Sequence, residues 1–397
     1  MRIAYVCADP GVPVFGSKGC SVHVQAVAGA LRAARVELQL FAVRQGGHPP
    51  PSLAGLPLRS LPCFDAAESA AREQAAFAAN GALRAALEAC GPFDAVYERY
   101  SLWSFAGMEY ARDKGVAGLL EVNAPLVEEQ AEHRELVNRE LAEAVAERAF
   151  AAASRLIAVS EPLALWAKRR MGARGRVEVV PNAIDPARFP PDVDPTLPAE
   201  GVFTVGFLGS LKPWHGLSIL ADAFARLHDD VSASRLLVVG DGAERCAFED
   251  ELVRHGVRHR TELTGAVGPH EVPGLLASMD AAVAPYPPRT QFYFSPLKLY
   301  EYMAAGLPVV ASRIGQVAEA LCHGEDGLLC APGDAEGIAQ ALGRLAAAPA
   351  LRERLGARAR QRVLAERTWS AVAERILLLA AECLSERRSI AVEAGRA

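Results

Sequence analysis

The chain has 397 residues, of which 51% are hydrophobic and 22% are charged, a composition typical of a globular protein with room for two domains. Its formal net charge of -5 argues against a nucleic-acid partner, because such partners usually select a basic surface. The eight cysteines include no Cys-x-x-Cys pair, so the sequence predicts neither a zinc site nor a disulfide framework and fits a reducing, cytoplasmic compartment.

We expect no segment that spans a membrane, because no run of about 18 consecutive apolar residues occurs. The first residues, MRIAYVCADPGVPVFG, lack the charged and long apolar regions of a secretory leader. One basic cluster is compatible with peripheral contact at the inner face of a membrane, but a solvated helix end is the favoured interpretation. This cluster comprises Lys168, Arg169, Arg170, Arg174 and Arg176.

The first half of the chain alternates strands with helices. Residues 2–8, RIAYVCA, read as a buried strand that ends at Asp-Pro-Gly, and a helix that Ser21 can cap precedes the next strand, VELQLFAV. Such alternation predicts a mainly parallel sheet covered by helices. The remaining predicted elements are an alanine-rich helix at 66–90, strands at 93–100 and 118–125, an acidic helix near 127–150, and strands at 154–160 and 176–185.

The chain is most proline-dense between residues 185 and 201, and we place an interdomain linker at 186–200. We therefore expect two α/β domains, 1–185 and 201–368, each with a Rossmann-like parallel sheet, that face each other across a cleft. Ligands of open parallel sheets bind at the carboxyl ends of the strands. The strands predicted after the linker lie at 203–210, 234–242, 261–267, 279–286, 306–312 and 326–334.

Two loops of the second half have the character of anion sites. In GFLGSLKPWHGL a strand ends at Gly209 and Ser210, and the loop then carries Lys212 and His215 to the start of a helix. A cation beside free helix amides favours phosphate, although Lys212 in a loop can equally point to water. In VVGDGAE, Gly240 can let the backbone approach a ligand, but an ordinary tight turn explains it as well.

The stretch FYFSPLKLYEYMAAGLPVVAS places Lys298 and Glu301 three residues apart on one face of a helix that begins near Ser295 and Pro296. Glu301 can accept hydrogen bonds from two neighbouring hydroxyls, as a ribose presents them, and Lys298 can neutralise phosphate charge. The structural alternative is an ion pair within the helix. We favour a binding role, because the residues around Glu301 are apolar and a buried carboxylate needs partners.

The N-terminal half offers a second candidate site. The loop GVPVFGSKGCSVHV presents Gly16, Lys18 and Gly19 before a helix that carries His23, and it suits a ligand with hydroxyls or phosphate. His23 is also explained as a satisfied histidine at an interface. In LEVNAPLVEE, Glu121 and Asn123 follow a predicted strand and come to the same edge of the sheet, or else cap the loop.

Taken together, these motifs resemble a known family. GSLKPWHG, VVGDGAE, FSPLKLYEYMAAGLPVVAS and DGLLCAPGD, which follow VVPNAIDPARF, resemble the donor-binding half of family 4 retaining glycosyltransferases with the GT-B fold, and GSKGCSVHVQ is similar to that family's first loop and helix. The resemblance implies a retaining glycosyltransferase of the hexosyltransferase type. No DxD-like acidic pair sits at a strand end in the donor half, so we expect no required metal or other cofactor. The resemblance also implies that the last helix, 369–397, crosses back to the first domain.

The substrates follow from the same resemblance. It implies a UDP- or GDP-sugar bound by the second domain and a carbohydrate or glycoconjugate acceptor bound mainly by the first. Glu301 matches the glutamate that binds ribose, and the amides near Pro296 and Leu297 match those that face the diphosphate. We expect base recognition around Val267. The remaining expected donor contacts are Gly209, Ser210, His215, Gly240, Tyr293 and Ser295, and the expected acceptor contacts are Gly16, Lys18, Gly19, Glu121 and Asn123.

The sequence departs from the family pattern. The first glutamate of the E-x7-E motif is replaced by Tyr293, and the Arg and Lys of the G-R-x-x-x-x-K-G loop are replaced by Ser210 and His215. A histidine that the family often carries at a strand end of the first domain is replaced near Asn123. We expect Lys212 and Lys298 to supply the lost charge.

For a diphosphate leaving group, catalysis needs charge neutralisation and exclusion of water. We expect Lys212, Lys298 and His23 to be the catalytic residues, closure about the linker to exclude water, and a donor phosphate oxygen to take the acceptor proton. Two alternatives stay open: an epimerase or phosphorylase on the same fold, and a sugar-nucleotide-binding subunit that has lost transfer.

Overall fold

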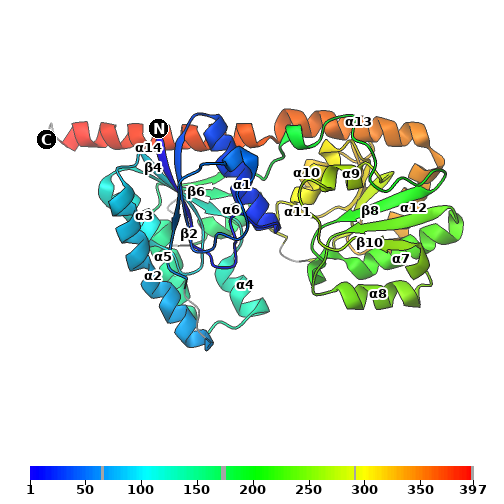
Figure 1. Cartoon of the computed structure of the whole chain (residues 1–397), viewed down its shortest axis with the longest axis horizontal. Coiled ribbons are helices and arrows are strands. Elements are labelled where there is room, and N and C mark those ends of the chain that lie inside the picture. The colour runs from blue at the N-terminus through cyan, green and yellow to red at the C-terminus, as the bar shows by residue number, and fades with distance from the viewer. Residues whose placement is uncertain (64–66, 171–175, 290–291, 395–397) are drawn as a thin grey trace. The chain divides into compact units, whose positions relative to one another are not determined.

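The computed structural model describes residues 1–63, 67–170, 176–289 and 292–394 (Figure 1). The chain divides into two compact units, of which the first comprises Met1–Asn182 with Trp369–Ala397 and the second comprises Ala183–Thr368. The predicted linker, residues 186–200, therefore lies within the second unit. There, the backbone N–H of Leu197 donates to Ser278 Oγ at 3.0 Å.

The first unit contains a seven-stranded sheet with the order β3-β2-β1-β4-β5-β6-β7, in which every strand pair is parallel. The chain order reverses between β1 and β4, and such switch points are where open α/β sheets bind ligands. The strands are β1 (Arg2–Cys7), β2 (Glu37–Ala42), β3 (Leu58–Ser60), β4 (Ala95–Arg99), β5 (Ala117–Val122), β6 (Arg155–Ala158) and β7 (Val177–Val179).

Helices cover this sheet, and the last helix of the chain is one of them. Helix α14 packs against α1 and β5. Its buried residues recur at helical spacing, which gives it one apolar face: Trp369, Ala373, Ile376, Leu379, Ala380 and Cys383. The helices of this unit are α1 (Gly19–Ala33), α2 (Ser69–Cys90), α3 (Ala106–Lys114), α4 (Leu126–His133), α5 (Arg139–Ala152), α6 (Glu161–Lys168) and α14 (Trp369–Ala394), with a short 3-10 helix η1 (Pro51–Leu53).

The second unit contains a six-stranded parallel sheet with the order β10-β9-β8-β11-β12-β13. Leu236 and Val238 of β9 belong to one hydrophobic cluster, whereas Leu237 and Val239 belong to another. Because alternate residues of a strand point to opposite faces, both faces of this sheet are buried. The strands are β8 (Phe203–Leu208), β9 (Ser234–Val239), β10 (Thr261–Leu263), β11 (Ala281–Ala284), β12 (Val309–Ser312) and β13 (Leu328–Cys330).

The helices of the second unit follow its strands as the alternating pattern predicts. They are α7 (Leu217–Asp230), α8 (Arg245–Arg254), α9 (Val272–Leu276), α10 (Leu297–Ala304), α11 (Gly315–Ala320), α12 (Ala335–Ala347) and α13 (Pro349–Glu366), with the 3-10 helices η3 (Pro186–Arg188), η4 (Pro213–His215) and η5 (Arg258–Arg260).

One predicted helix is divided. The acidic segment near 127–150 forms α4 and α5, with a break between them. The carboxylate of Glu73, on α2, accepts hydrogen bonds from the backbone N–H groups of Val137 and Asn138, both at 2.8 Å. A buried glutamate from another helix therefore satisfies the amides at the start of α5, and a pattern read along the segment alone does not reveal this.

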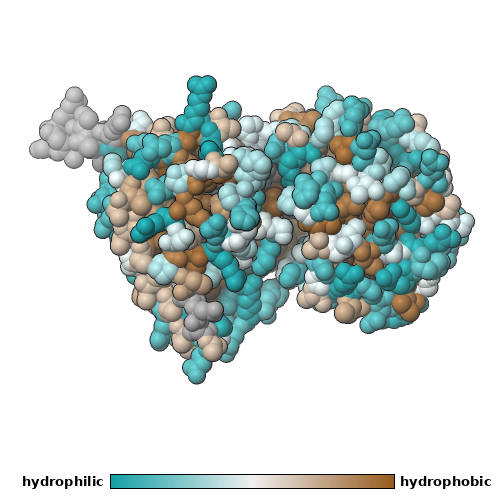
Figure 2. Space-filling model, viewed as in Figure 1, coloured by the Kyte–Doolittle hydropathy of each residue, from teal (hydrophilic) through white to brown (hydrophobic). Residues whose placement is uncertain are grey.

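Among the described residues, no helix is both long enough and apolar enough to cross a membrane. Hydrophilic and hydrophobic residues alternate over the visible face of each unit (Figure 2).

Candidate functional site

The loops that leave β8 and β9 are held tightly together. The N–H of Gly209 donates to Val239 O at 2.9 Å, and the N–H of Leu211 donates to Asp241 O at 3.0 Å. Gly240 has φ of +138°, and a Cβ on it would lie 2.1 Å from Gly209 O. Gly240 is thus required for the two loops to approach each other, which agrees with the tight-turn explanation of VVGDGAE.

Lys298 lies in the first turn of α10 with a side chain that is almost fully buried. Its Nζ lies 4.1 Å from the centroid of the Phe207 ring and 5.9 Å from that of Tyr286. A Cβ on Gly209 would come within 2.8 Å of this nitrogen. Lys298 Nζ has no hydrogen-bond partner among the described residues.

The environment of Lys298 disfavours its charge. Burial lowers the pKa of the ammonium to about 7, although Glu301 acts in the opposite direction. An ammonium that is buried without a hydrogen-bonded partner is costly, and an anion beside Gly209 would relieve that cost. Lys298 is therefore suited to bind phosphate.

Glu301, one turn further along α10, pairs with Arg188 rather than with Lys298. Arg188 Nη1 donates to Glu301 Oε1 at 3.2 Å, and Arg188 Nη2 donates to Pro269 O, also at 3.2 Å. Burial raises the pKa of Glu301, against the opposing effects of Arg188 and Lys298. Arg188 lies in the motif VVPNAIDPARF, but the sequence did not predict it as a site residue. Its contact with Glu301 joins residues 113 positions apart, so the sequence pattern does not reveal it.

His215 is a neutral imidazole that packs on aromatic rings. Its pKa is lowered to about 3 by burial and by the positive charges of Lys298 and Lys212. Its Nδ1–H donates to Ser210 O at 2.5 Å, which fixes the tautomer. His215 therefore cannot supply the cation that the family's loop carries at this position, and Lys212 and Lys298 are the basic side chains near it.

An aromatic cluster surrounds this part of the second unit. Trp214 stacks on Phe294 with ring centroids 6.3 Å apart, and Tyr293 lies 4.5 Å from Phe294 by the same measure. The Lys212 ammonium lies 5.9 Å from the centroid of the Trp214 ring. Tyr293, in place of an acidic residue, thus adds an aromatic surface to the segment that leads into α10. Ser295 is buried, Pro296 is the N-cap of α10, and Val267 packs partly against the core.

In the first unit, Glu121 of β5 contacts four side chains, which come from α1, β4 and the residue after the end of β5. Tyr97 OH donates to Glu121 Oε1 at 2.6 Å, and Asn123 Nδ2 donates to Oε2 at 2.9 Å. His23 Nε2 lies 2.7 Å from Oε1, and Arg99 Nη1 lies 3.6 Å from Oε2. The structure thus brings His23, Glu121 and Asn123 together, although His23 and Glu121 are 98 positions apart.

The partners of Glu121 keep its carboxylate ionised. Burial acts to raise its pKa, but His23, Arg99 and Tyr97 outweigh burial and lower it to about 2. Because an ionised carboxylate only accepts hydrogen bonds, the Nε2 of His23 must carry a proton. With both oxygens engaged and its side chain 3% exposed, Glu121 has the environment of a residue that holds His23 in place.

The second ring nitrogen of His23 is not engaged. Nδ1 is buried and has no hydrogen-bond partner among the described residues. The ring meets Trp369 of α14 edge to face, with centroids 5.1 Å apart. The contacts of Nε2 and of the ring are those of a histidine packed at an interface, whereas Nδ1 has no such contact among the described residues.

The glycine loop before α1 is partly fastened by the helix itself. Gln25 Nε2 donates to Val14 O at 3.0 Å and to Gly16 O at 2.9 Å. Lys18 is the exposed N-cap of α1, and a Cβ on Gly19 would meet no atom within 4 Å. Gly16 is thus packed in the loop, whereas Lys18 and Gly19 present an open helix start.

The basic cluster is divided between internal contacts and solvent. Arg170 donates to Glu128 at 2.7 Å and also pairs with Glu143, so its charge is neutralised within the first unit. Lys168 and Arg169 are exposed, Arg176 makes contacts of its own, and Arg174 lies outside the described residues.

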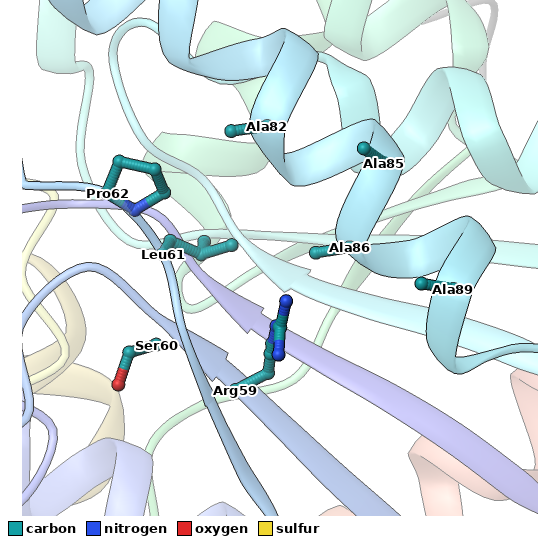
Figure 3. A pocket seen from close by; sticks show the side chains of 8 residues that line it. All are labelled: Arg59, Ser60, Leu61, Pro62, Ala82, Ala85, Ala86 and Ala89. Atoms are coloured by element: carbon teal, nitrogen blue, oxygen red, sulfur yellow. The ribbon is translucent and has the colours of Figure 1, made fainter.

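A pocket of about 610 Å³ lies between the end of β3 and the alanine face of α2 (Figure 3). None of the site residues that the sequence predicts line this pocket. It is lined by Arg59, Ser60, Leu61, Pro62, Ala82, Ala85, Ala86 and Ala89.

Within the described parts of the chain, no three His, Cys, Asp or Glu side chains are grouped as a metal site.

Two family models match the chain. The model for Glycosyltransferase Family 4 matches residues 17–188, and the model for Glycosyl transferases group 1 matches residues 202–348. Glycogen synthase of Mycobacterium tuberculosis (strain CDC 1551 / Oshkosh) is 32% identical over 199 residues, which cover 50% of this chain and 46% of that protein. 2-deoxystreptamine glucosyltransferase of Streptomyces kanamyceticus is 30% identical over 223 residues, with coverages of 54% and 57%. The chain thus spans about half the length of these curated relatives.

Solved structures agree with this assignment. Sucrose-phosphate synthase from Thermosynechococcus elongatus superposes with a TM-score of 0.76 at 21% identity, covering 97% of this chain and 100% of that one. HepE from Anabaena, in complex with UDP and glucose, superposes with a TM-score of 0.73 at 20% identity, with coverages of 97% and 99%. At such identities the likeness establishes the fold, which is GT-B. With the two family models on its two units, the chain is a glycosyltransferase of the family 4 type.

Proposed function

We propose that this protein transfers a sugar from a nucleotide-diphospho-sugar to an acceptor hydroxyl with retention of the anomeric configuration. The observation that carries the proposal is the start of α10, where the buried ammonium of Lys298, which has no hydrogen-bond partner among the described residues, lies beside Gly209 and the carboxylate of Glu301 lies one turn away. The relatives are named as synthases and transferases, which favours transfer over the epimerase and binding-only alternatives.

The donor would bind to the second unit. Glu301 would accept hydrogen bonds from the ribose hydroxyls, and the free amides of Leu297 and Lys298 would face the diphosphate. The Lys298 ammonium would neutralise charge as the diphosphate leaves, and Lys212 would add a second cation. HepE is described in complex with UDP-glucose, so UDP-sugars are the first donors to test, with GDP-sugars next.

The acceptor, a carbohydrate or glycoconjugate, would bind to the first unit near the start of α1, where Lys18 and Gly19 are exposed. In the proposed front-face step, the acceptor oxygen bonds to the anomeric carbon as the bond from that carbon to the phosphate oxygen breaks. The acceptor proton passes to the departing phosphate oxygen, so no side-chain base is consumed. His23, held by Glu121, would position the acceptor. A lipid-linked acceptor would add contact with the inner face of a membrane, for which the exposed Lys168 and Arg169 are candidates.

The test combines binding with turnover on the purified 397-residue chain. We expect one of UDP, GDP and ADP to raise the melting temperature, and we expect Glu301→Gln and Lys298→Met each to remove most of that shift. The control is Glu366→Gln, at a half-exposed position on α13. Release of nucleoside diphosphate from the matching sugar donor, stimulated by an acceptor, then measures transfer, and NMR of the product reports the anomeric configuration. Stabilisation by none of the three nucleotides would contradict the proposal.

A further inference from the structure

Arg188 connects two parts of the candidate donor site that are distant in the sequence. It lies in η3, whose first turn is capped by Asp185, with Asp185 Oδ1 accepting from the N–H of Ala187 at 3.0 Å. Its guanidinium donates to Glu301 on α10 and to the carbonyl of Pro269, which lies between β10 and α9. The Arg188 side chain thus fixes the distance between Glu301, whose carboxylate is expected to bind the ribose, and the segment around Val267.

The base of the Arg188 side chain is held firmly. The next residue, Phe189, is 1% exposed and belongs to a core cluster of the second unit. Its carbonyl accepts from Arg360 Nη2 of α13 at 2.7 Å. Since Phe189 fastens η3 to the core directly after Arg188, the guanidinium reaches Glu301 from a fixed backbone position.

The geometry leaves Glu301 able to bind a ligand. Arg188 contacts Oε1, and a carboxylate has about four acceptor positions on its two oxygens. The side chain of Glu301 is 16% exposed, and that of Arg188 is 27% exposed. A vicinal diol can therefore reach the carboxylate while the arginine remains in place.

We infer that Arg188 is a positioning residue for nucleotide recognition, which holds the Glu301 carboxylate in place for the ribose hydroxyls and ties α10 to the segment around Val267. The inference rests on the proposed function. It differs from that proposal in assigning ribose recognition to a pair of residues rather than to Glu301 alone.

The test uses a ligand that lacks the groups Glu301 is proposed to bind. Isothermal titration of the purified chain would compare UDP with 2′,3′-dideoxy-UDP, or the GDP pair where the wild type prefers GDP. We expect the wild type to prefer the ribonucleotide by roughly tenfold or more, as loss of a hydrogen bond to a charged group predicts. Arg188→Gln should lower that preference to within about threefold. Arg188→Gln should weaken binding of the ribonucleotide and leave binding of the dideoxynucleotide unchanged. Arg188→Lys should retain part of the preference for the ribonucleotide.

Two controls and three outcomes complete the experiment. Glu301→Gln should show the same loss of preference, whereas Arg226→Gln, at an exposed position on α7, should bind as the wild type does. Equal weakening of both nucleotides by Arg188→Gln, with Arg188→Lys equally weak, would overturn the inference in favour of a purely structural role. Full preference in Arg188→Gln would also overturn it. A wild type that binds neither nucleotide would instead overturn the proposed function, and the inference with it.

Discussion

At the scale of single residues, we expect Lys298 to lower the stability of the ligand-free protein while it supports nucleotide binding. Its ammonium is buried against Phe207 and has no hydrogen-bond partner in the part of the chain that the structure describes, so replacing Lys298 with an apolar residue of similar volume should stabilise the ligand-free protein. We expect Lys298→Met to melt at a higher temperature than the wild type without nucleotide, and to gain little when nucleotide is added. Thermal unfolding with and without UDP or GDP measures both effects.

The difference in stability between the wild type and Lys298→Met should depend on pH with a definite sign. The folded-state pKa of Lys298, about 7, lies below its ordinary value of 10.5, so between these pH values the unfolded chain binds more protons than the folded chain. The wild type should therefore gain up to about 1.4 kcal/mol per pH unit over Lys298→Met as the pH rises from 7 toward 10. The advantage of the variant should be largest at pH 7 and below. A difference that stays constant from pH 6 to 10 would show that the ammonium is not buried.

Glu121 gives a pH dependence of the same sign at lower pH, because its ionised form stabilises the folded state. Because its pKa is lowered to about 2 in the folded state from an ordinary 4.5, it contributes on the order of 3 kcal/mol that is present above pH 4.5 and lost as the pH falls toward 2. We expect Glu121→Gln to lose about this much stability of the first unit at pH 7, and the deficit to narrow in acid. Denaturant unfolding at pH 7 and pH 3.5 measures the difference.

The tryptophans allow this measurement to be restricted to the first unit. Of the four, Trp214 lies in the second unit and the other three lie in the first. Tryptophan fluorescence in a Trp214→Phe background therefore follows the first unit. The control is Glu132→Gln, at an exposed position on α4, which should change stability by less than about 0.5 kcal/mol. If Glu121→Gln loses stability in acid as the wild type does, Glu121 is not the source of the acid dependence.

The candidate site shows which residues a sequence can reveal. Lys298 and Glu301 were predicted because they share a helix face three residues apart, and Glu121 and Asn123 were predicted to reach one sheet edge. His23 was predicted as a site residue on the first helix, without its contact to Glu121. The partners Arg188, Tyr97 and Arg99 were not singled out. Arg188 meets Glu301 across 113 positions, and Tyr97 meets Glu121 across 24, so these pairings depend on how the strands and loops are arranged in space.

At the scale of elements, the two loops after β8 and β9 form one structural unit. A Cβ on Gly240 would lie 2.1 Å from the carbonyl oxygen of Gly209, and Gly240 has a positive φ of 138°. We expect Gly240→Ala to separate the loops, to cost about 1–3 kcal/mol of stability, and to weaken nucleotide binding at least tenfold. Thermal unfolding and titration with UDP or GDP measure these effects.

The matched control is a glycine of the same unit in open space. A Cβ on Gly343, within helix α12, would meet no atom within 4 Å. Gly343→Ala should therefore stabilise the second unit by about 0.5–1 kcal/mol through helix propensity and leave nucleotide binding unchanged. If both variants bind nucleotide equally well, the contact between the loops is not needed for the site.

The elements were predicted better in type than in extent. Alternation of apolar runs and helical patterns predicted both parallel sheets, because strands buried on both faces leave a clear apolar signal. The division between α4 and α5 was not predicted, since Glu73 of another helix makes it. The proline-dense segment at 186–200 was read as a linker, yet Phe189 is buried in the core of the second unit. Proline density indicates irregular backbone, and it does not show whether that backbone packs.

At the scale of the whole molecule, the chain begins and ends in the same unit. The first unit is completed by α14, which joins residues after 368 to a sheet built from residues before 183. The second unit is continuous in sequence, so we expect it to fold without the ends of the chain. The two units should therefore respond differently to truncation.

Deletion of residues 369–397 tests this difference. It removes the six buried residues of α14, among them Trp369 and Ile376, and burial of each large apolar side chain stabilises a fold by about 1.5–3 kcal/mol. The sum is comparable to the total stability of a typical domain, about 5–15 kcal/mol, so the first unit should unfold or become protease-sensitive. The second unit should remain folded and still bind nucleotide. A deletion of residues 390–397 alone leaves all six buried residues in place and is the control for their loss. If the longer deletion leaves the first unit resistant to protease, α14 is not part of its core, and loss of nucleotide binding would show that the second unit depends on the first.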